Sequence, residues 1–425
     1  MDGPPGFAAR SVAPADLRRH NLSLVVRHVR SHGPCARSEI AAATGLVRGS
    51  VTGLVGVLLS QGWLREVPGP PGRPTRSALV ELDGAGLAVL ALHVDGDGVR
   101  CRASDVAGRV LLWAQRGHRA AHPRPAAVAD AASELVRRAC ADLAARGTAV
   151  ARVVVVVSAP VTGTPPRVPV SIDLGWREVP LLELLAERLP GLDVPLSLIN
   201  DANAAVLAEF GELRARPGAA GAPPLTDVVL LKSDTGVGGA WITGSRLVTG
   251  SRGAAFEPGH VVVDPAGAPC SCGQRGCLAV VAGPHAVLRD GGLDALRRTA
   301  GARAALEELL VRADAGRARP VRALRRAGVA IGRVVATLVV LTDPQHVVLG
   351  GYWARALPHL RPGVEEALAA LTLPDGGTAR PAAGLVVAGT AGDDAALRGA
   401  SCWALEELLD DPVGAARRAE QQFKP

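Results

Sequence analysis

A run of closely spaced cysteines lies between Glu257 and Cys277 and constrains the fold more than any other segment. Three of the seven cysteines fall within eight residues, at Cys270, Cys272 and Cys277, and His260 stands ten residues before the first. One histidine and three cysteines suit tetrahedral zinc, and the two glycines between the cysteines permit a backbone that wraps a small ion. The spacing is not that of a zinc finger. By itself it leaves a metal site and a cluster of buried or redox-active thiols as open alternatives.

The same stretch contains the pattern E-x-G-H, a short spacer and C-x-C-G-x-x-G-C, and it resembles the signature of the ROK family (repressors, open reading frames and sugar kinases). The resemblance implies a structural zinc ion with four ligands: His260, Cys270, Cys272 and Cys277. It also implies that Glu257 and His260 contact a sugar. A histidine can serve both partners, because its two ring nitrogens are separate ligands.

The length and composition of the chain indicate a globular protein. With 425 residues, of which 48% are hydrophobic, there is room for two or three domains and a sizeable core. No apolar segment near Met1 resembles a signal peptide, and no run approaches about 18 uninterrupted apolar residues. We therefore expect a cytoplasmic protein without a membrane partner, whose cysteines are reduced thiols or metal ligands. Lysine occurs only at Lys232 and Lys424, so arginine supplies nearly all the positive charge.

Positive charge is concentrated at the N-terminus. Residues 1–80 contain ten arginines and four acidic residues, a net charge of +6 out of +7 for the whole chain. A basic terminal segment on a nearly neutral body is typical of a nucleic-acid-binding module. The alternative is a solubilising surface with no partner.

The helical pattern of residues 21–61 favours DNA binding. Apolar residues recur at helical spacing from Asn21, and Gly33-Pro34 ends that helix. A short alanine-rich helix follows from Arg37, Gly45 supplies a turn, and a longer helix extends over about Val47–Gln61. This arrangement predicts a helix-turn-helix whose second helix enters the major groove. The candidate DNA contacts on these two helices are Arg37, Arg48, Ser50 and Thr52.

Two predicted strands, Trp63–Val67 and Ser77–Leu82, flank a Pro- and Gly-rich loop. Its Gly-Arg-Pro sequence resembles the wing of ROK repressors, and we expect Arg73 and Arg76 to reach phosphate or the minor groove. Ala36 and Val47 stand where the family has serine caps, and each loss costs on the order of 1 kcal/mol unless Ser38 and Ser50 cap the helices later. A tri-helical interaction domain is the alternative to a DNA-binding one.

From Gly84 the pattern changes to strands and turns, and it resembles the start of an actin-like sugar kinase. In such kinases the first tight loop reads Asp-x-Gly-Gly-Thr and cradles the phosphates of ATP. Here His93, Asp95 and Asp97 replace the aspartate, a glycine and the threonine, and the acidic side chains would repel a polyphosphate. A second departure is Ala279, where the family usually has an acidic sugar ligand. We expect the kinase-like fold without enzyme activity.

The sequence Asn200-Asp201-Ala-Asn203 follows an apolar strand and matches the N-D-x-N motif of the family. The resemblance implies that Asn200 and Asp201 bind sugar, and that Asp201 occupies the position of the base in the kinases. The alternative for Asp201 is a helix N-cap. The Gly-rich turn 233–239 resembles the second phosphate loop, and the D-P-x-x-V-V-x-G-G pattern from Asp343 to Gly351 also fits the family.

These observations predict an α/β protein with an N-terminal winged helix-turn-helix followed by a two-lobed, actin-like or sugar-kinase-like (ribonuclease H-like) ATPase fold. The expected divisions are a flexible N-terminus, the DNA-binding domain, a small lobe completed by a C-terminal helix, a large lobe with the zinc site, and a tail, at residues 1–20, 21–82, 83–199, 200–410 and 411–425.

The function that we expect is a sequence-specific transcriptional regulator of carbohydrate metabolism, in the form of a repressor. Its partners would be operator DNA, a sugar or sugar-phosphate effector and further copies of itself, as a homodimer or higher homo-oligomer. Two alternatives remain open. One is an ATP-dependent sugar kinase with an added DNA-binding domain, and the other is a regulator that has lost its sugar and responds to a protein partner.

Overall fold

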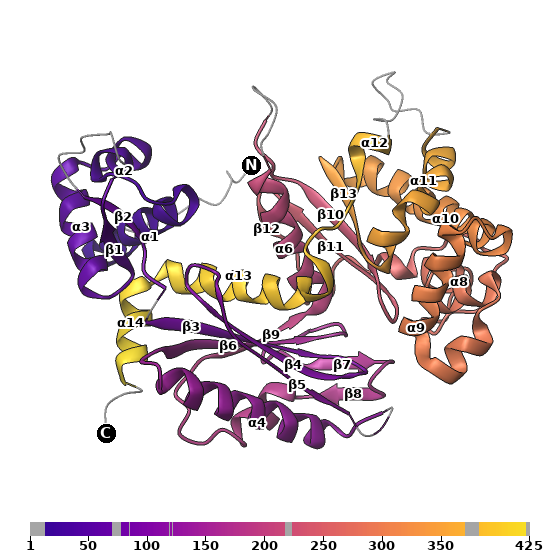
Figure 1. Ribbon diagram of the computed structural model, residues 1–425, viewed down its shortest axis with the longest axis horizontal. Helices are drawn as coiled ribbons and strands as arrows, with labels where there is room; N and C mark the ends of the chain where they lie inside the picture. Colours follow the sequence, from indigo (N-terminus) through magenta and orange to yellow (C-terminus); the bar gives the residue numbers. More distant parts are fainter. Residues whose placement is uncertain are drawn as a thin grey trace, which may run out of the picture.

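The computed structural model describes residues 13–69, 78–84, 86–118, 120, 122–216, 223–369 and 382–421. The chain forms an N-terminal helical module and a body with two lobes, and each lobe is built on a five-stranded sheet (Figure 1). A long C-terminal helix extends from the junction of the lobes to the N-terminal module (Figure 1).

The N-terminal module consists of three helices and a two-stranded antiparallel sheet, the elements that the predicted winged helix-turn-helix requires, and the loop between the two strands lies outside the described residues. Its elements are α1 (Pro14–His32), α2 (Arg37–Thr44), α3 (Arg48–Ser60), β1 (Leu64–Val67) and β2 (Leu79–Leu82). The two strands pair in register from Leu64 opposite Leu82. The apolar residues at helical spacing, among them Val25 and Val55, are fully buried between the three helices.

Helices α2 and α3 of the module begin without serine N-caps. Ala36 and Val47 are the N-cap residues of α2 and α3, and neither side chain caps its helix. The carboxylate of Glu39 accepts the backbone N–H of Ala36 at 2.8 Å, which satisfies one exposed donor of α2. Gly45 ends α2 with φ +72°, the left-handed conformation that glycine adopts without strain.

The small lobe contains a mixed sheet in the order β5-β4-β3-β6-β9. Its strands are, in that order, Val110–Gly117, Gly98–Asp105, Leu87–Val94, Ala149–Val157 and Leu196–Asn200. The central strands β3 and β6 are apolar on both faces, because helices cover both sides of the sheet. Helix α4 (Pro125–Ala144) packs on one face with α5 (Leu181–Ala186), and α13 (Ala395–Asp410) packs on the other.

The large lobe contains a second mixed sheet in the order β12-β11-β10-β13-β14. Its strands are, in that order, Arg246–Leu247, Val237–Thr243, Val228–Ser233, His346–Gly351 and Val386–Ala388. Helix α6 (Asp201–Ala215) covers one face. The other face is covered by a helical layer of α8 (Pro284–Gly291), α9 (Asp294–Asp314), α10 (Ala318–Thr342) and α11 (Tyr352–Ala369).

Several shorter elements complete the two lobes. The antiparallel pair β7 (Val168–Ser171) and β8 (Trp176–Val179) projects from the small lobe. The cysteine-rich stretch lies between η1 (Pro258–His260) and α7 (Leu278–Val281). The short elements α12 and η2 flank β14, at Ala382–Leu385 and Gly392–Asp394.

Two predictions about the ends of the chain are wrong. Residues 411–425 do not form a simple tail, because Pro412–Gln421 form helix α14, and its Ala415 and Ala416 are buried in the same core as the N-terminal module. The N-terminal 1–20 segment is not flexible throughout, because α1 begins at Pro14. Proline favours the first turn of a helix, but the side chains of residues 14–20 are exposed, so that turn has no apolar periodicity to reveal it.

Among the described residues, no single helix is long and apolar enough to cross a membrane. Helices α2 and α3 meet the length and composition requirement only when they are taken together, and they are bent by 116°.

Candidate functional site

The predicted metal ligands converge in the large lobe. The ligand atoms of His260, Cys270, Cys272 and Cys277 all lie within 4.8 Å of one another. The Sγ of Cys270 is 3.6 Å from Nδ1 of His260, and the Sγ atoms of Cys272 and Cys277 are also 3.6 Å apart. Two sulfur ligands of a tetrahedral zinc lie about 3.8 Å apart, since each Zn–S bond is about 2.3 Å long. The donor set and its spacing therefore fit a tetrahedral ion.

The backbone around the cluster explains the two glycines of the motif. Gly276 has φ +65°, and a Cβ at this position would lie 1.5 Å from the carbonyl oxygen of Asp264. Gly273 has φ +92° and donates to the carbonyl oxygen of Cys270 at 3.0 Å. Any side chain at 276 would push the loop apart, so glycine is required there for the cysteines to meet.

Asn200 and Asp201 stand where β9 ends and α6 begins, at the junction of the two lobes. Asn200 is the N-cap of α6, and its side-chain oxygen accepts the N–H groups of Ala202 and Asn203 at 2.9 and 3.0 Å. Its amide nitrogen donates to the carbonyl oxygen of Ala159 at 2.9 Å. The N-cap alternative therefore applies to Asn200, and the carboxylate of Asp201 is free of that role.

Asp201 is paired with Lys232, which lies at the carboxyl end of β10. The Nζ of Lys232 donates to Oδ2 of Asp201 at 2.7 Å and to Oδ2 of Asp234 at 2.8 Å. Burial, the largest single effect, would raise the pKa of Asp201, but the charge and hydrogen bond of Lys232, together with His93 and the backbone N–H of Ala202, hold the pKa below its usual value. Burial opposes the charge of Lys232 as well, yet the two carboxylates raise its pKa. Both partners are therefore ionised.

At the position of the first phosphate loop, His93 and Asp95 are in contact with other side chains. Nδ1 of His93 lies 2.6 Å from Nη2 of Arg100, and the same Nη2 donates to Asp95 at 3.0 Å. On its other side, Nε2 of His93 lies 3.3 Å from Oγ of Ser158, which donates to Asp201 at 3.4 Å. Burial lowers the pKa of His93 to about 4, so the ring is neutral near pH 7. A continuous polar chain thus connects the first loop with Asp201.

Glu257 precedes η1 and His260 ends it, and η1 packs on β11 beside the Gly-rich turn. Gly259 has no space for a side chain, because a Cβ there would lie 2.4 Å from the carbonyl oxygen of Val237. Burial raises the pKa of Glu257, the charge of His260 opposes this rise, and the nearby charge of Asp201 adds to it. The charge of Asp201 therefore acts on Glu257. The structure brings the predicted sugar contacts to one region: Asn200, Asp201, Glu257 and His260.

The turn after β10 contacts the opposite lobe. Thr235 donates its hydroxyl to Asp173, which lies between β7 and β8 of the small lobe. Within the turn, the hydroxyl of Ser233 donates to the carbonyl oxygen of Gly236 at 2.8 Å. On β4 of the small lobe, Arg100 places its Nη1 3.8 Å from Asp394 at the start of α13. Polar contacts thus link the turn after β10 and the start of α13 to the small lobe.

The candidate DNA contacts on α3 are exposed, as a DNA-reading helix requires. Arg48, Ser50 and Thr52 all face solvent. Arg37 is placed differently, because it is half-buried and forms an ion pair of 2.6 Å with Glu66 of β1. Arg37 thus braces α2 against the small sheet in this structure. The wing residues Arg73 and Arg76 lie outside the described residues.

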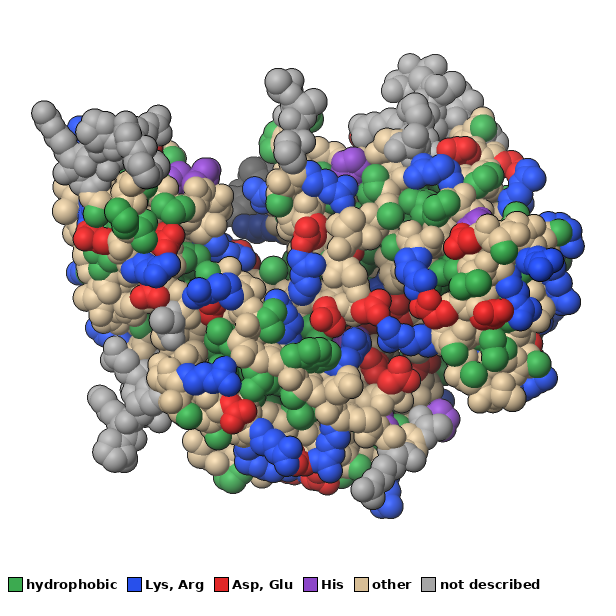
Figure 2. All heavy atoms as spheres, viewed as in Figure 1, with side chains coloured by type: hydrophobic (Ala, Val, Ile, Leu, Met, Phe, Trp, Pro, Cys, Tyr) green, Lys and Arg blue, Asp and Glu red, His purple; other side chains and the backbone are tan. Residues whose placement is uncertain are grey.

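The module is held to the body by polar and apolar contacts. In α1, Arg27 forms ion pairs with Glu406 and Asp410 of α13, and Arg30 pairs with Glu406. Figure 2 shows that the N-terminal module protrudes from the body, with a gap between the module and the upper part of the body. Its attachment runs along α13 and α14, so these two helices set its orientation.

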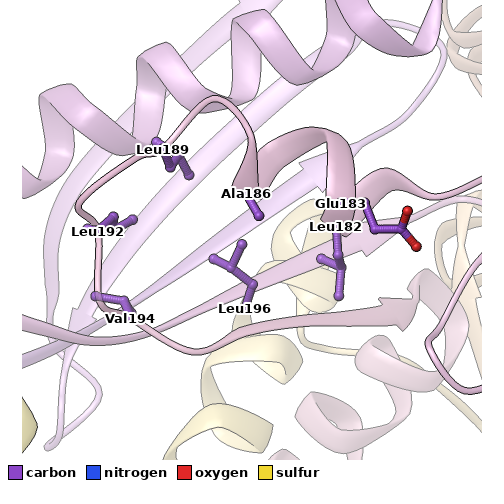
Figure 3. A pocket seen from close by; sticks show the side chains of 7 residues that line it. All are labelled: Leu182, Glu183, Ala186, Leu189, Leu192, Val194 and Leu196. Carbon is purple, nitrogen blue, oxygen red and sulfur yellow. The ribbon is translucent and has the colours of Figure 1, made fainter.

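An apolar cavity of about 410 Å³ lies between α5 and the start of β9 (Figure 3). Its lining residues are Leu182, Glu183, Ala186, Leu189, Leu192, Val194 and Leu196. Asp201 follows the opposite end of β9, so the cavity is separate from the polar groups around Asp201. Its lining has a single ionisable group, and we assign it no chemistry.

A comparison with protein families supports the interpretation of the cysteine-rich motif. The model of the ROK family matches residues 89–407, three quarters of the chain. The chain belongs to the ROK family. Residues 13–69, which contain the three helices of the N-terminal module, precede the matched segment.

Relatives of this ROK protein include both regulators and kinases. The N-acetylmannosamine kinase of Citrobacter koseri is 34% identical over 177 residues, which are 42% of this chain and 55% of that protein. The chain spans about half the length of the curated relatives that it matches first. A ROK family transcriptional regulator, a homologue of the E. coli MLC protein, superposes with a TM-score of 0.76 and 20% identity, covering 95% of this chain and 100% of the other.

A ROK family glucokinase from Streptomyces griseus, solved with glucose and AMPPNP, matches the body alone. It superposes with a TM-score of 0.57 and 25% identity, covering 74% of this chain and 98% of the glucokinase. The body of this ROK protein is therefore sugar-kinase-like, as predicted, and the likeness to the regulator extends the match over the N-terminal module.

These relatives contradict the prediction that the chain is not an enzyme. That prediction rested on His93, Asp95 and Asp97 in the first loop. Sequence relatives at 34% identity are nevertheless named N-acetylmannosamine kinase. The physical reason is that one altered loop does not remove the other parts of a phosphoryl-transfer site, and Asp201 is still present beside the Gly-rich turn.

The sequence interpretation missed the partners of Asp201. Lys232 and Arg100 were not expected at the site, although both lie within its polar chain. A signal was present for Lys232, because it is one of two lysines and directly follows an apolar strand. Arg100 had no such signal, since arginine is common throughout the chain.

Proposed function

We propose that this protein is a sequence-specific transcriptional regulator of carbohydrate metabolism, acting as a repressor in the cytoplasm. The observation that carries the proposal is the exposed α3 helix on a module docked to a sugar-kinase-like body. Arg48, Ser50 and Thr52 read base edges in the major groove, where side chains of a recognition helix distinguish base pairs. Arg73 and Arg76 contact the DNA backbone or minor groove.

The effector in this proposal is a sugar or sugar phosphate bound between the lobes. Asn200, Asp201, Glu257 and His260 supply the sugar contacts, because ionised carboxylates accept hydroxyl hydrogens strongly. A zinc ion on His260 and three cysteines ties the loop that carries Glu257 to the large lobe. The zinc is structural, since four protein ligands leave no open position.

Helix α13 supplies a physical route from the cleft to DNA. Its start contacts Arg100 beside the first loop, and its end pairs with Arg27 and Arg30 of the DNA-binding module. A sugar that favours one separation of the lobes shifts α13 and with it the module. In a homodimer or higher oligomer, this movement changes the spacing of two α3 helices that read a palindromic operator.

The test is selection of bound fragments from the source genome at physiological salt. Wild-type protein should recover discrete fragments with a shared palindrome, and the selected sites should bind less tightly on addition of the effector sugar. Arg48→Ala should lose the enrichment. The matched control is Arg325→Ala, which removes an exposed arginine from the body. Sequence-indifferent binding by the wild type, or equal enrichment by Arg48→Ala, would contradict this assignment.

A second candidate function is ATP-dependent phosphorylation of a sugar. It is favoured by the N-acetylmannosamine kinase relative and by Asp201 at the position of the kinase base. In this mechanism Asp201 accepts the proton of the attacking hydroxyl. ADP release should be measured with N-acetylmannosamine and common hexoses, with Asp201→Asn as the inactive control. Release above background that Asp201→Asn abolishes would support this function, and release equal in both proteins would oppose it.

A further inference from the structure

Lys232 is the cation among the polar groups around Asp201. Its ammonium group lies 2.7 Å from a carboxylate oxygen of Asp201 and 2.8 Å from one of Asp234. Only 10% of its side chain is exposed, compared with 18% for Asp201 and 54% for Asp234. The two carboxylates come from different elements, the start of α6 and the turn after β10. Lys232 therefore joins two parts of the site that have no other common partner among the described contacts.

The sheet is shaped to hold this side chain. Lys232 is on the face of β10 that α6 covers, as are Val228 and Leu230. Its neighbours in the sheet are glycines on both sides, Gly238 on β11 and Gly350 on β13. A Cβ at Gly350 would lie 3.1 Å from Cβ of Lys232, which is tighter than ordinary van der Waals contact. The absence of side chains on both neighbours leaves room for the lysine to extend toward Asp201.

The other groups that face Asp201 do not supply positive charge. His93 on β3 is neutral near pH 7 because burial lowers its pKa to about 4. Ser158 and Asn200 offer a hydroxyl and an amide. Glu257 adds a carboxyl group whose pKa burial raises. Without Lys232, the carboxyl groups of Asp201 and Asp234 would lie near one another without a cation between them.

Proteins that hold two carboxylates close together commonly place Mg²⁺ or another divalent cation between them. Here an ammonium group on the chain itself occupies that position, at hydrogen-bond distance from both. We propose that Lys232 is the resident cation of the cleft, taking the place of a free divalent ion for Asp201 and Asp234, so that the cleft binds its sugar without Mg²⁺. This inference rests on the proposed sugar-binding function and specifies how that site is neutralised.

The first arm of the test asks whether a divalent cation enters the cleft. Zinc-loaded protein without nucleotide is titrated with Mn²⁺ and followed by electron paramagnetic resonance. Wild type should bind no Mn²⁺, whereas Lys232→Met should bind about one ion per chain, because the carboxylates then lack a counter-charge. Lys232→Arg should behave as the wild type. Arg325→Met is the matched control, since it removes a cation from an exposed ion pair with Glu366.

The second arm measures sugar affinity by calorimetry with and without millimolar Mg²⁺. The dissociation constant of the wild type should not change, and that of Lys232→Met should fall by roughly tenfold when Mg²⁺ is added. Mn²⁺ binding by the wild type, a Mg²⁺-dependent affinity of the wild type, or no Mn²⁺ binding by folded Lys232→Met would overturn the inference.

The two proposals fail in distinguishable ways. If no sugar binds to any variant, the sugar-binding function fails, while Mn²⁺ binding by Lys232→Met still supports the role of Lys232. If Lys232→Met does not fold, the wild-type measurements decide alone: Mn²⁺ exclusion with Mg²⁺-independent sugar binding supports the role, and either opposite result overturns it.

Discussion

The indole nitrogen of Trp63 donates a hydrogen bond of 2.7 Å to the backbone carbonyl oxygen of Pro412. These residues are 349 positions apart, one after α3 and the other at the start of α14. Trp63 is fully buried, and Leu405, Leu408 and Ala415 belong to the same apolar core. The first and last parts of the described chain therefore pack together, which gives the N-terminal module a fixed position on the body.

Trp63→Phe should destabilise the protein by about 1–3 kcal/mol, because a buried carbonyl loses its hydrogen-bond donor. Chemical denaturation at neutral pH measures this change. Trp113→Phe is the control, since Trp113 is 49% exposed on β5 and its replacement should change the stability by less than about 0.5 kcal/mol. Equal stability of the two variants would show that the contact with Pro412 does not hold the module.

Cys272→Ser should lower the metal content of the purified protein. We expect about one zinc per chain in the wild type, and much less in the variant because one of four ligands is lost. Elemental analysis gives the metal content and thermal unfolding gives the accompanying loss of stability. Cys140→Ser changes a cysteine outside the cluster and should keep the metal. A wild type without zinc would refute the four-ligand site.

His93→Gln should make the protein less sensitive to mild acid. The pKa of His93 is about 4 in the folded protein and about 6.5 in an unfolded chain. As the pH falls below 6.5, the unfolded state takes up a proton that the folded state does not, so folding loses stability. The folded protein therefore keeps its full stability with respect to His93 above pH 6.5, and it loses this stability progressively as the pH falls toward 4.

The measurement compares denaturation of wild type and His93→Gln from pH 7 to pH 4.5. As the pH falls, the free energy of unfolding of His93→Gln should rise relative to that of the wild type by up to about 3 kcal/mol. The exposed His20 provides the control substitution His20→Gln, which should follow the wild type. Parallel pH profiles for all three proteins would contradict a buried neutral His93.

Gly53→Ala should stabilise α3 and weaken DNA binding. Gly53 is exposed in the helix, and a Cβ there meets nothing within 4 Å. Alanine should therefore raise the stability by about 0.5–1 kcal/mol. A methyl group on the face that approaches DNA should at the same time reduce affinity for the selected fragments by roughly tenfold.

Gly211→Ala on α6 is the matched control for this substitution. Gly211 is also exposed and has open space around its Cβ position. Its replacement should give a similar gain in stability and leave DNA affinity unchanged. Binding assays on the two variants separate an effect on the recognition helix from an effect on folding. Unchanged affinity of Gly53→Ala would place the DNA contacts elsewhere.

The predictions from the sequence were most accurate where the evidence is local. The ligand cluster of His260 and three cysteines spans 18 residues, and tight turns at Gly273 and Gly276 bring these residues together. The helix-turn-helix has a similar basis, because apolar spacing and the left-handed Gly45 are properties of neighbouring residues. Asn200 as the cap of α6 was a near miss, since the capping pattern was recognised but attributed to Asp201.

Local patterns were insufficient at the C-terminus. Residues 412–421 contain alanine and arginine without a broad apolar stripe, and the sequence interpretation made them a tail. They form a helix because Ala415 and Ala416 are small enough to pack closely against the N-terminal module. That packing partner lies more than three hundred residues away in the chain.

By itself, the sequence determined the family and grouped the candidate metal ligands, because each depends on spacing within a short segment. Only the tertiary structure decided that Lys232 would meet Asp201, 31 residues away, and that Arg100 would contact His93 beside Asp394. These contacts depend on the order of strands in two sheets and on where α6 and α13 pack. Ion pairs between separate elements form only when packing fixes both partners, and no local pattern encodes that placement.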